Sequence, residues 1–162
     1  MTTKTERPPK IPPSWFVHLA WKVHRALHRL SGGRFLWTSA SKRGWGALRL
    51  TTTGRRTGEP RNVIVGYLDE GDDLLLLAMN GWQDGHPSWW LNLQAHPEAV
   101  VQLAHQPPRK VRAREATGEE RPRLWQRWTE VDGDLDSIVA RRTPEPAVLL
   151  LEPIADDVAT ED

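Results

Sequence analysis

One short segment of the sequence combines glycines and arginines in a way that suits the binding of an anion. Residues 51–61 read TTTGRRTGEPR and contain two glycines and three arginines. Glycine lets the backbone approach a ligand closely, and the backbone N–H groups of such a loop form anion-binding concavities. Arg55, Arg56 and Arg61 add guanidinium groups that match phosphate or carboxylate. The segment is predicted to bind an anion, and the alternative is a hairpin turn whose arginines face water.

Two further segments place polar and aromatic residues at the ends of predicted elements. Residues 78–82 (AMNGW) leave a buried strand, where a loop with Asn and Gly brings backbone close to a ligand ring. Residues 86–92 (HPSWWLN) open a helix, whose first N–H groups lack partners within the helix and so suit an anion. Trp89 and Trp90 project about 100° apart on a helix, so one indole is able to face the core and the other a ligand. The alternative is that both indoles pack in the core.

Other kinds of chemistry are excluded by residues that are missing or badly spaced. The sequence has no cysteine, so disulfides, thiolate metal sites and a thiol nucleophile are excluded. Its histidines show no metal-ligand spacing, and it contains neither a G-x-S-x-G elbow nor a Walker phosphate loop. The basic residues lack the context of a nucleic-acid-binding motif, and we expect no nucleic-acid partner. Nine Trp stand against two Phe and one Tyr, which excludes chemistry that needs several phenols.

The charges are distributed unevenly along the 162 residues, although the formal net charge is only +1. No acidic residue lies between Glu6 and Glu59, a stretch that holds eleven Lys and Arg. Residues 59–162 carry ten basic and twenty acidic residues. This basic first third predicts an anionic partner, such as membrane lipid, phosphate or a polyanionic cofactor. The alternative is that the two parts of the chain attract each other in the folded protein.

The N-terminal region has two predicted parts. Residues 1–13 contain four prolines and are expected to form a flexible arm. Residues 14–31 are predicted to form a basic amphipathic helix, which either binds an anionic membrane surface or packs on its own domain. The sequence shows no secretory signal and no apolar run long enough to span a bilayer, so we expect a cytoplasmic protein. Binding through residues 14–31 would place it at the inner face of the plasma membrane.

Short strands and helices alternate through the remaining sequence. Strands are predicted over 47–53, 61–68, 74–79, 98–104, 109–116 and 147–152, and helices over 87–95, 117–131 and 135–142. The third strand is apolar throughout, which predicts burial on both faces, and the short connection between the fourth and fifth excludes parallel pairing. The predicted fold class is mainly β (α+β), a closed or split β-barrel of about six mostly antiparallel strands with flanking helices. One domain is expected over 14–154, followed by an acidic tail at 155–162.

Three sequence blocks resemble the deazaflavin-dependent nitroreductase family of actinobacteria. They are TTTGRRTGEPR at 51–61, LLLLAMNGWQDGHPSWWLNLQAHPEAVVQL at 74–103 and VRAREATGEERPRLWQRW at 111–128. Members of that family are split β-barrel oxidoreductases that use coenzyme F420. The resemblance covers about 45–152 and implies this fold, with coenzyme F420 favoured over FMN as the cofactor.

The resemblance also implies which residues bind the cofactor. In that family the deazaflavin lies in a groove of the barrel, and its phosphate and oligoglutamate tail meet a basic loop. The implied cofactor-binding residues are Arg55, Arg56, Thr57 and Arg61 in the loop; Asn62, Val63, Ile64, Val65, Gly66 and Tyr67 in the next strand; Leu77, Ala78, Met79 and Asn80 at the end of the third strand; and Ser88, Trp89, Trp90, Leu91 and Asn92 at the helix start. The reduced deazaflavin carries the hydride, so no protein nucleophile or metal is required.

The sequence departs from the best-known members of the family on the substrate side. Residues 79–82 (MNGW) replace a pattern that begins with serine, Gly66 stands where those members have an aromatic residue, and 132–139 lack their tyrosines. Two functions are compatible with these features of the sequence. The first is an oxidoreductase that transfers a hydride from reduced F420 to a quinone, a nitroaromatic or a similar flat electrophile, and the arginine loop favours it. The second, favoured by the lost serine and tyrosines, is a non-catalytic protein that binds F420, another flavin, a fatty acid or haem.

Overall fold

A computed structural model describes residues 36, 38–40, 44–81 and 83–155 of the chain. Contacts divide the chain into two compact units, Met1–Arg34 and Phe35–Asp162, and all the described residues belong to the second. The predicted N-terminal arm, the predicted helix at 14–31, Trp82 and most of the predicted tail lie outside the described residues. Within the described part of the chain, no helix is long and apolar enough to cross a membrane.

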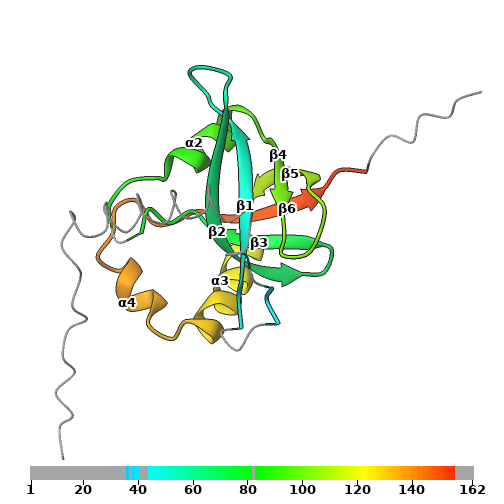
Figure 1. Ribbon diagram of the computed structural model, residues 1–162. Coiled ribbons are helices and arrows are strands. Elements are labelled where there is room, and N and C mark those ends of the chain that lie inside the picture. The colour runs from blue at the N-terminus through cyan, green and yellow to red at the C-terminus, as the bar shows by residue number, and fades with distance from the viewer. Residues whose placement is uncertain (1–35, 37, 41–43, 82, 156–162) are drawn as a thin grey trace, which may run out of the picture. The chain divides into compact units, whose positions relative to one another are not determined.

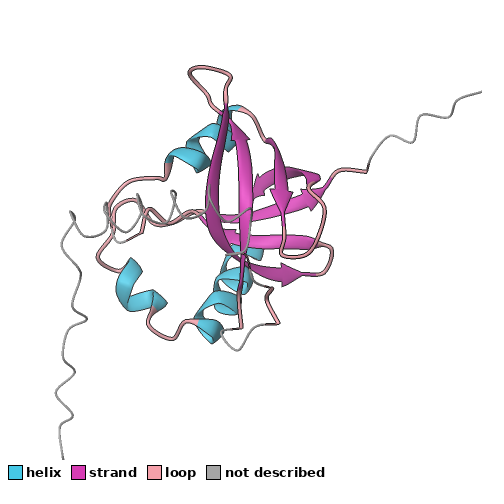
Figure 2. Cartoon of the chain, viewed as in Figure 1, coloured by secondary structure: helices cyan, strands magenta, loops and turns pink. Residues whose placement is uncertain are grey.

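Six strands form a barrel in which every neighbouring pair is antiparallel (Figures 1 and 2). The strands are β1 (Gly46–Thr53), β2 (Pro60–Glu70), β3 (Asp73–Leu77), β4 (Glu98–Gln102), β5 (Arg109–Glu115) and β6 (Val148–Pro153). They follow one another around the barrel in the order β1-β2-β3-β6-β5-β4. The predicted barrel of about six mostly antiparallel strands is therefore confirmed, and so is the antiparallel pairing of β4 with β5.

Three described helices flank the barrel, namely α2 (Ser88–Ala95), α3 (Glu120–Val131) and α4 (Leu135–Val139). The predicted helix over 135–142 is too long: α4 ends at Val139, and the N–H of Arg142 bonds to the carbonyl of Val139, three residues back, as in a turn rather than an α-helix. Pro87 is the residue before α2 rather than its first helical residue, since its backbone is extended with ψ of 146°. The β2–β3 turn is also tighter than expected, because the strands leave only Gly71, with φ of +63°, and Asp72 between them.

Two apolar clusters stabilise this arrangement, one inside the barrel and one beneath α3 and α4. Leu74 and Leu76 of β3 belong to the inner cluster, whereas Leu75 between them belongs to the outer cluster with Leu124 and Trp128 of α3. Successive side chains of a strand point to opposite faces, so a continuous apolar strand contributes to both clusters. The predicted burial of this strand on both faces is confirmed.

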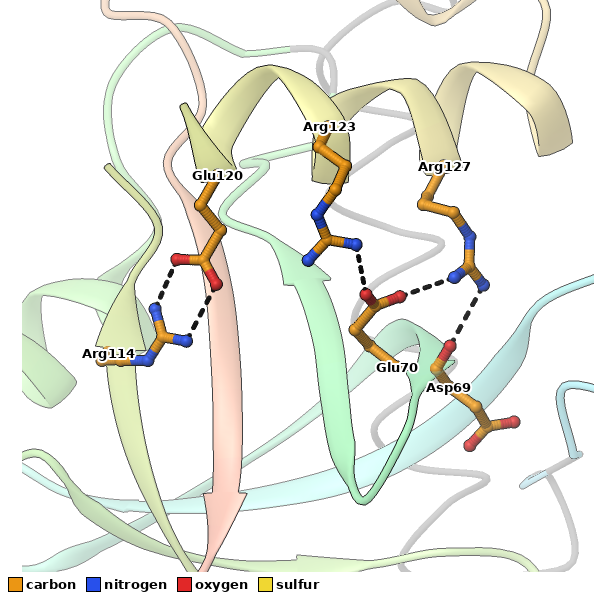
Figure 3. Close-up of polar contacts among 6 residues, drawn as sticks. All are labelled: Asp69, Glu70, Arg114, Glu120, Arg123 and Arg127. Carbon is orange, nitrogen blue, oxygen red and sulfur yellow. Dashed lines mark hydrogen bonds and ion pairs between the residues drawn. The ribbon is translucent and has the colours of Figure 1, made fainter. Parts of the chain in front are cut away.

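Ion pairs attach the start and the middle of α3 to the barrel (Figure 3). Glu70, at the end of β2, accepts hydrogen bonds from Arg123 Nη1 and Arg127 Nη1, each at 2.5 Å. Near the start of α3, Arg114 of β5 donates two hydrogen bonds to Glu120 at 2.6 and 2.9 Å. These bonds from Arg114 lower the pKa of the Glu120 carboxyl. The helix is thereby fixed against both the β2–β3 hairpin and β5.

Replacing Glu70 by glutamine is expected to lower the free energy of unfolding by about 1 kcal/mol, because two arginines lose their charged partner. The Glu70 side chain is only 17% exposed, so solvent screens these pairs less than it screens surface pairs. The matched control is Glu98→Gln, which breaks one pair between side chains that are 64% and 60% exposed, and little change is expected. Urea unfolding of the three proteins measures both effects. Equal losses in the two variants would contradict the role of Glu70.

Candidate functional site

One edge of β2 is unpaired along most of its length, although the six strands form a closed barrel. This strand pairs with β1 over eight residue pairs but with β3 over only three, all at the hairpin end. The edge of 60–67 that faces away from β1 therefore has no strand partner within the described residues, and we refer to it as the open edge of β2. The unpaired N–H and C=O groups of such an edge are able to bind another hydrogen-bonding edge. Residues 62–67 lie on this edge, and 77–80 leave β3, the strand next to β2 around the barrel.

The side chains of β2 divide between the two faces of the sheet. Tyr67 belongs to the inner cluster, and Val63 and Val65 pack against it. Since side chains alternate along a strand, Asn62, Ile64 and Gly66 lie on the outer face. The resemblance implied that all of 62–67 flank the cofactor. Tyr67 is buried in the barrel and Val63 and Val65 are half-buried, and the cofactor contact implied for 62–67 stays a prediction.

The outer face at Gly66 is covered by two indoles that sequence reasoning did not assign to the site. A Cβ atom at Gly66 would lie 3.3 Å from the Trp45 ring and 3.7 Å from the Trp128 ring. Trp45 therefore supplies, beside Gly66, an aromatic surface that residue 66 itself does not provide. A glycine within a strand marks the close approach of another group, and this was the signal available in the sequence. The indole N–H of Trp128 is buried without an acceptor among the described residues.

The arginine loop, residues 54–59, is a tight hairpin connection between β1 and β2. The N–H of Gly54 donates to the carbonyl of Glu59 at 2.8 Å, and the N–H of Gly58 donates to the carbonyl of Gly54 at 2.7 Å. Gly58 has φ of +71°, a conformation that glycine adopts without strain. The sequence predicted either an anion site or a hairpin turn for this segment. The structure shows a hairpin turn, and because its arginines are exposed, the turn is compatible with anion binding.

Exposed guanidinium groups at and beside this loop give it the donor set of an anion site. The side chains of Arg55, Arg56 and Arg61 are exposed. Arg61 Nη2 donates to the hydroxyl of Thr57 at 3.2 Å, whereas Arg56 has no hydrogen bond or ion pair with any described residue. Three positive charges stand near the single carboxylate of Glu59, so this end of β2 is electropositive.

A buried polar network anchors the arginine loop to α2. The Oδ1 atom of Asn92 accepts hydrogen bonds from Arg55 N at 3.2 Å and Arg55 Nη1 at 3.1 Å. The Nδ2 atom of Asn92 donates to the hydroxyl of Thr52 at 3.1 Å. Asn92 is 5% exposed and Thr52 is 1% exposed, and these are the buried polar residues of the described chain. Asn92 was predicted to bind the cofactor, and its contacts in the structure hold Arg55.

The two adjacent tryptophans of α2 both face the core, whereas helical geometry allowed one of them to face a ligand. Trp89 and Trp90 both belong to the inner cluster, so the alternative of core packing describes both indoles. Helix α2 contacts β1, and both of its indoles pack into the inner cluster. Their implied role in cofactor binding stays a prediction. At the same helix start, Ser88 is exposed and Leu91 is half-buried.

The end of β3 is tied to other parts of the chain rather than left free. Ala78 is 1% exposed in the inner cluster, whereas Leu77 and Met79 pack against the outer cluster. Asn80 Nδ2 donates to the carbonyl of Asp84 at 3.4 Å. Packing therefore fixes residues 77–79, and a hydrogen bond fixes Asn80.

The only tyrosine of the chain is not placed to donate a proton to a ligand. Tyr67 is 2% exposed, and its ring packs so closely on Gly46 that a Cβ atom there would overlap it. Burial raises the pKa of Tyr67, and the negative charge of Asp69 raises it further. The phenol therefore stays protonated inside the barrel, and any proton donated at the open edge must come from another group.

The pockets of the described chain lie away from the implied cofactor-binding residues, and no metal site is found among the described residues. One pocket of about 550 Å³ lies between α3 and α4, and a smaller one of about 240 Å³ lies beside the arginine loop. Neither pocket is lined by any of the implied cofactor-binding residues. Among the described residues there is no group of three His, Cys, Asp or Glu side chains that could hold a metal ion. A ligand at the open edge would therefore lie along strand and loop surfaces.

Comparison with known proteins identifies relatives that share this barrel. An F420H(2)-dependent quinone reductase of Mycobacterium tuberculosis is 33% identical over 85 residues, which are 51% of this chain and 54% of that protein. The chain thus spans about half the length of this curated relative. A second protein of that organism with the same family designation is 28% identical over 106 residues, 65% of this chain and 88% of that protein.

Solved structures agree with these relatives. The structure described as an F420-H2 dependent reductase has a TM-score of 0.58 and 29% identity, and the match covers 65% of this chain and 93% of that one. A structure described as a domain-swapped dimer has a TM-score of 0.60 and 25% identity, and the match covers 86% of this chain and 100% of that one. The sequence profile of F420H(2)-dependent quinone reductases matches residues 23–151, well over half of the chain. This match confirms the resemblance to deazaflavin-dependent reductases, and the protein belongs to the F420H(2)-dependent quinone reductase family.

Proposed function

We propose that the protein binds coenzyme F420 and transfers a hydride from its reduced form to a quinone, with nitroaromatics and similar flat electrophiles as further acceptors. The observation that carries this proposal is the open edge of β2, which has the exposed arginine loop at one end. Family membership and the names of the relatives support both the cofactor and the acceptor.

The residues of the site fit the two chemically different parts of this cofactor. The anionic tail matches the guanidinium groups of Arg55, Arg56 and Arg61, of which Arg56 has no partner in the described chain. The flat ring system, which carries hydrogen-bonding groups at its edge, matches the unpaired backbone groups of the open edge of β2. When bound, the deazaflavin would supply the hydride, and one proton from solvent would complete the hydroquinone.

In this proposal the protein binds and orients the cofactor, and none of its side chains reacts with the substrate. Asn92 holds Arg55 in place, so that a positive charge is fixed before the ligand arrives. Trp45 and Trp128 cover the outer face at Gly66 and exclude water from that part of β2. No nucleophilic side chain is needed for hydride transfer, which agrees with a site that is built from backbone, arginine and indole groups.

The expected contact with an anionic membrane would bring the protein to membrane quinones. This prediction depends on residues 14–31, which lie outside the described residues. It remains part of the proposal, as does a cytoplasmic location near the inner face of the plasma membrane.

Titration with F420, FMN and haem tests the proposal, with tryptophan fluorescence of the full chain as the readout. We expect F420 to quench the emission and to bind more tightly than FMN or haem. Quenching by FMN or haem but not by F420 would overturn the cofactor assignment. Tight F420 binding without oxidation of its reduced form by any quinone or nitroaromatic would favour the non-catalytic alternative.

A further inference from the structure

The segment between α4 and β6 is bonded to the loop that leads from β3 to α2. We propose that Arg142 in this segment is a positioning residue for the cofactor, which acts through the carbonyl of Gly81 to hold the end of β3 in the conformation that binds F420. This inference rests on the proposed function and adds a residue that sequence reasoning did not assign to the site. Arg142 would act on the ligand only through residues 77–80, whose contact with the cofactor is itself a prediction.

Backbone bonds join the two segments near both ends of the loop. The N–H of Ala78 donates to the carbonyl of Ala147 at 2.9 Å, which extends the pairing of β3 with β6. The N–H of Gly85 donates to the Thr143 carbonyl, and the N–H of Thr143 donates to Asp84 Oδ1, both at 3.0 Å. In Figure 1 the orange segment after α4 and the green segment before α2 accordingly lie on the same side of the barrel.

Arg142 contacts the loop between these backbone bonds. Its Nη1 atom donates to the carbonyl of Gly81, the residue directly after the implied contact residues 77–80. Asn80 Nδ2 donates to the carbonyl of Asp84 at 3.4 Å, so Asn80 is bonded within the same loop. Because Gly81 is covalently attached to Asn80, a displacement of Gly81 would move Asn80 as well.

The surroundings of Arg142 indicate that its charge does not serve stability. Arg142 Nε is buried without a hydrogen-bond partner, and no carboxylate forms an ion pair with the guanidinium within the described residues. Burial lowers the pKa of Arg142, and the negative charge of the exposed Asp84 opposes this shift. A buried charge without an ionised partner is unfavourable for folding. The contribution of Arg142 is therefore the loop conformation that its bond to Gly81 specifies.

The chain offers both a conservative variant and a matched control. Lysine keeps the charge and a donor, but its flexible stem lacks the planar guanidinium, so Arg142→Lys should hold Gly81 less firmly than arginine does. The neighbouring Arg141 is exposed and has no hydrogen bond or ion pair with any described residue. Arg141→Ala therefore removes the same charge from the same segment without removing a bond to the loop.

Fluorescence titration of the full chain with F420 tests the assignment. Arg142→Ala should weaken F420 binding about tenfold, because only the fraction of the protein whose loop keeps its native position binds the ligand. Arg142→Lys should recover part of this loss, and Arg141→Ala should bind F420 as the native protein does. Asp84→Ala removes the acceptor of the Thr143 N–H and leaves the buried charge in place, and it should weaken binding by about threefold.

Turnover separates positioning from chemistry. In Arg142→Ala the KM for reduced F420 should rise about tenfold, whereas kcat at saturating F420 should stay near the native value. A native KM with a lowered kcat would contradict a role in holding the cofactor-binding conformation.

Amide hydrogen exchange of the free protein measures the loop without any ligand. Arg142→Ala should speed exchange in 78–81 and 83–85, while the amides of β1 keep their native rates. Faster exchange in β1 as well, together with native F420 affinity, would show a purely structural role for Arg142.

The two proposals fail in different ways. If the native protein binds F420 and Arg142→Ala binds it equally tightly, the positioning role is wrong and the proposed function stands. If the native protein does not bind F420, the proposed function fails and the cofactor role of Arg142 fails with it, whereas faster local exchange in the variant would still show that Arg142 holds the loop.

Discussion

Reversing the charges of Arg55 and Arg56 together is expected to weaken the binding of F420 by at least about a hundredfold. Each arginine contributes a hydrogen bond between charged groups, worth about 1.5–3 kcal/mol, and the substituted glutamates would repel the anionic tail. The effect should be largest at low ionic strength, because salt screens exposed charges. Fluorescence titration of Arg55→Glu/Arg56→Glu at two salt concentrations measures it.

Two further variants separate the charge of the loop from its structure. Arg56 has no partner in the described chain, so Arg56→Glu alone should weaken F420 binding and leave the free energy of unfolding unchanged. Arg141 is exposed but far from the arginine loop in sequence, and Arg141→Glu should leave F420 binding unchanged. If the double variant bound F420 as tightly as the native protein does, the arginine loop would have no role in holding the tail.

The second large effect is expected at Asn92. The substitution Asn92→Leu keeps the approximate size of the side chain but removes the bonds to Arg55 and Thr52. Leaving buried donors and acceptors without partners costs about 1–3 kcal/mol, so the urea midpoint should fall clearly. Because Arg55 would lose its anchor, F420 binding should also weaken by about tenfold.

The exposed residue Gln94 on the same helix provides the control for this substitution. Gln94→Leu should change neither the urea midpoint nor the affinity for F420. A protein with Asn92→Leu that unfolds at the native urea concentration would show that the network contributes nothing. A destabilised protein with native F420 affinity would show that Asn92 does not position Arg55 for the ligand.

The sequence was sufficient to predict the barrel because alternation and turn residues act locally. Each of the six strands was located to within a few residues, and the apolar run of β3 correctly indicated burial on both faces. The bounds that were wrong depend on tertiary context. The helix at 135–142 ends at Val139 in the structure, and β4 ends at Gln102 rather than at 104.

The candidate site was predictable only in part. The arginine loop follows from residue types and spacing, because its glycines and arginines adjoin one another in the chain. The open edge of β2 depends on where pairing with β3 stops, and local sequence does not specify this. The contact of Trp45 with Gly66 and the burial of both α2 tryptophans likewise depend on how distant segments pack.

Turnover measures directly whether the protein oxidises reduced F420 with a quinone. The full chain is mixed with reduced F420 and menadione, and the absorbance of the oxidised deazaflavin is followed. We expect one F420 to be oxidised for each menadione reduced, at a rate proportional to the protein concentration and greatly lowered in Arg55→Glu/Arg56→Glu. Reduced F420 that binds the protein but stays reduced in the presence of quinone would show that the protein is not a quinone reductase.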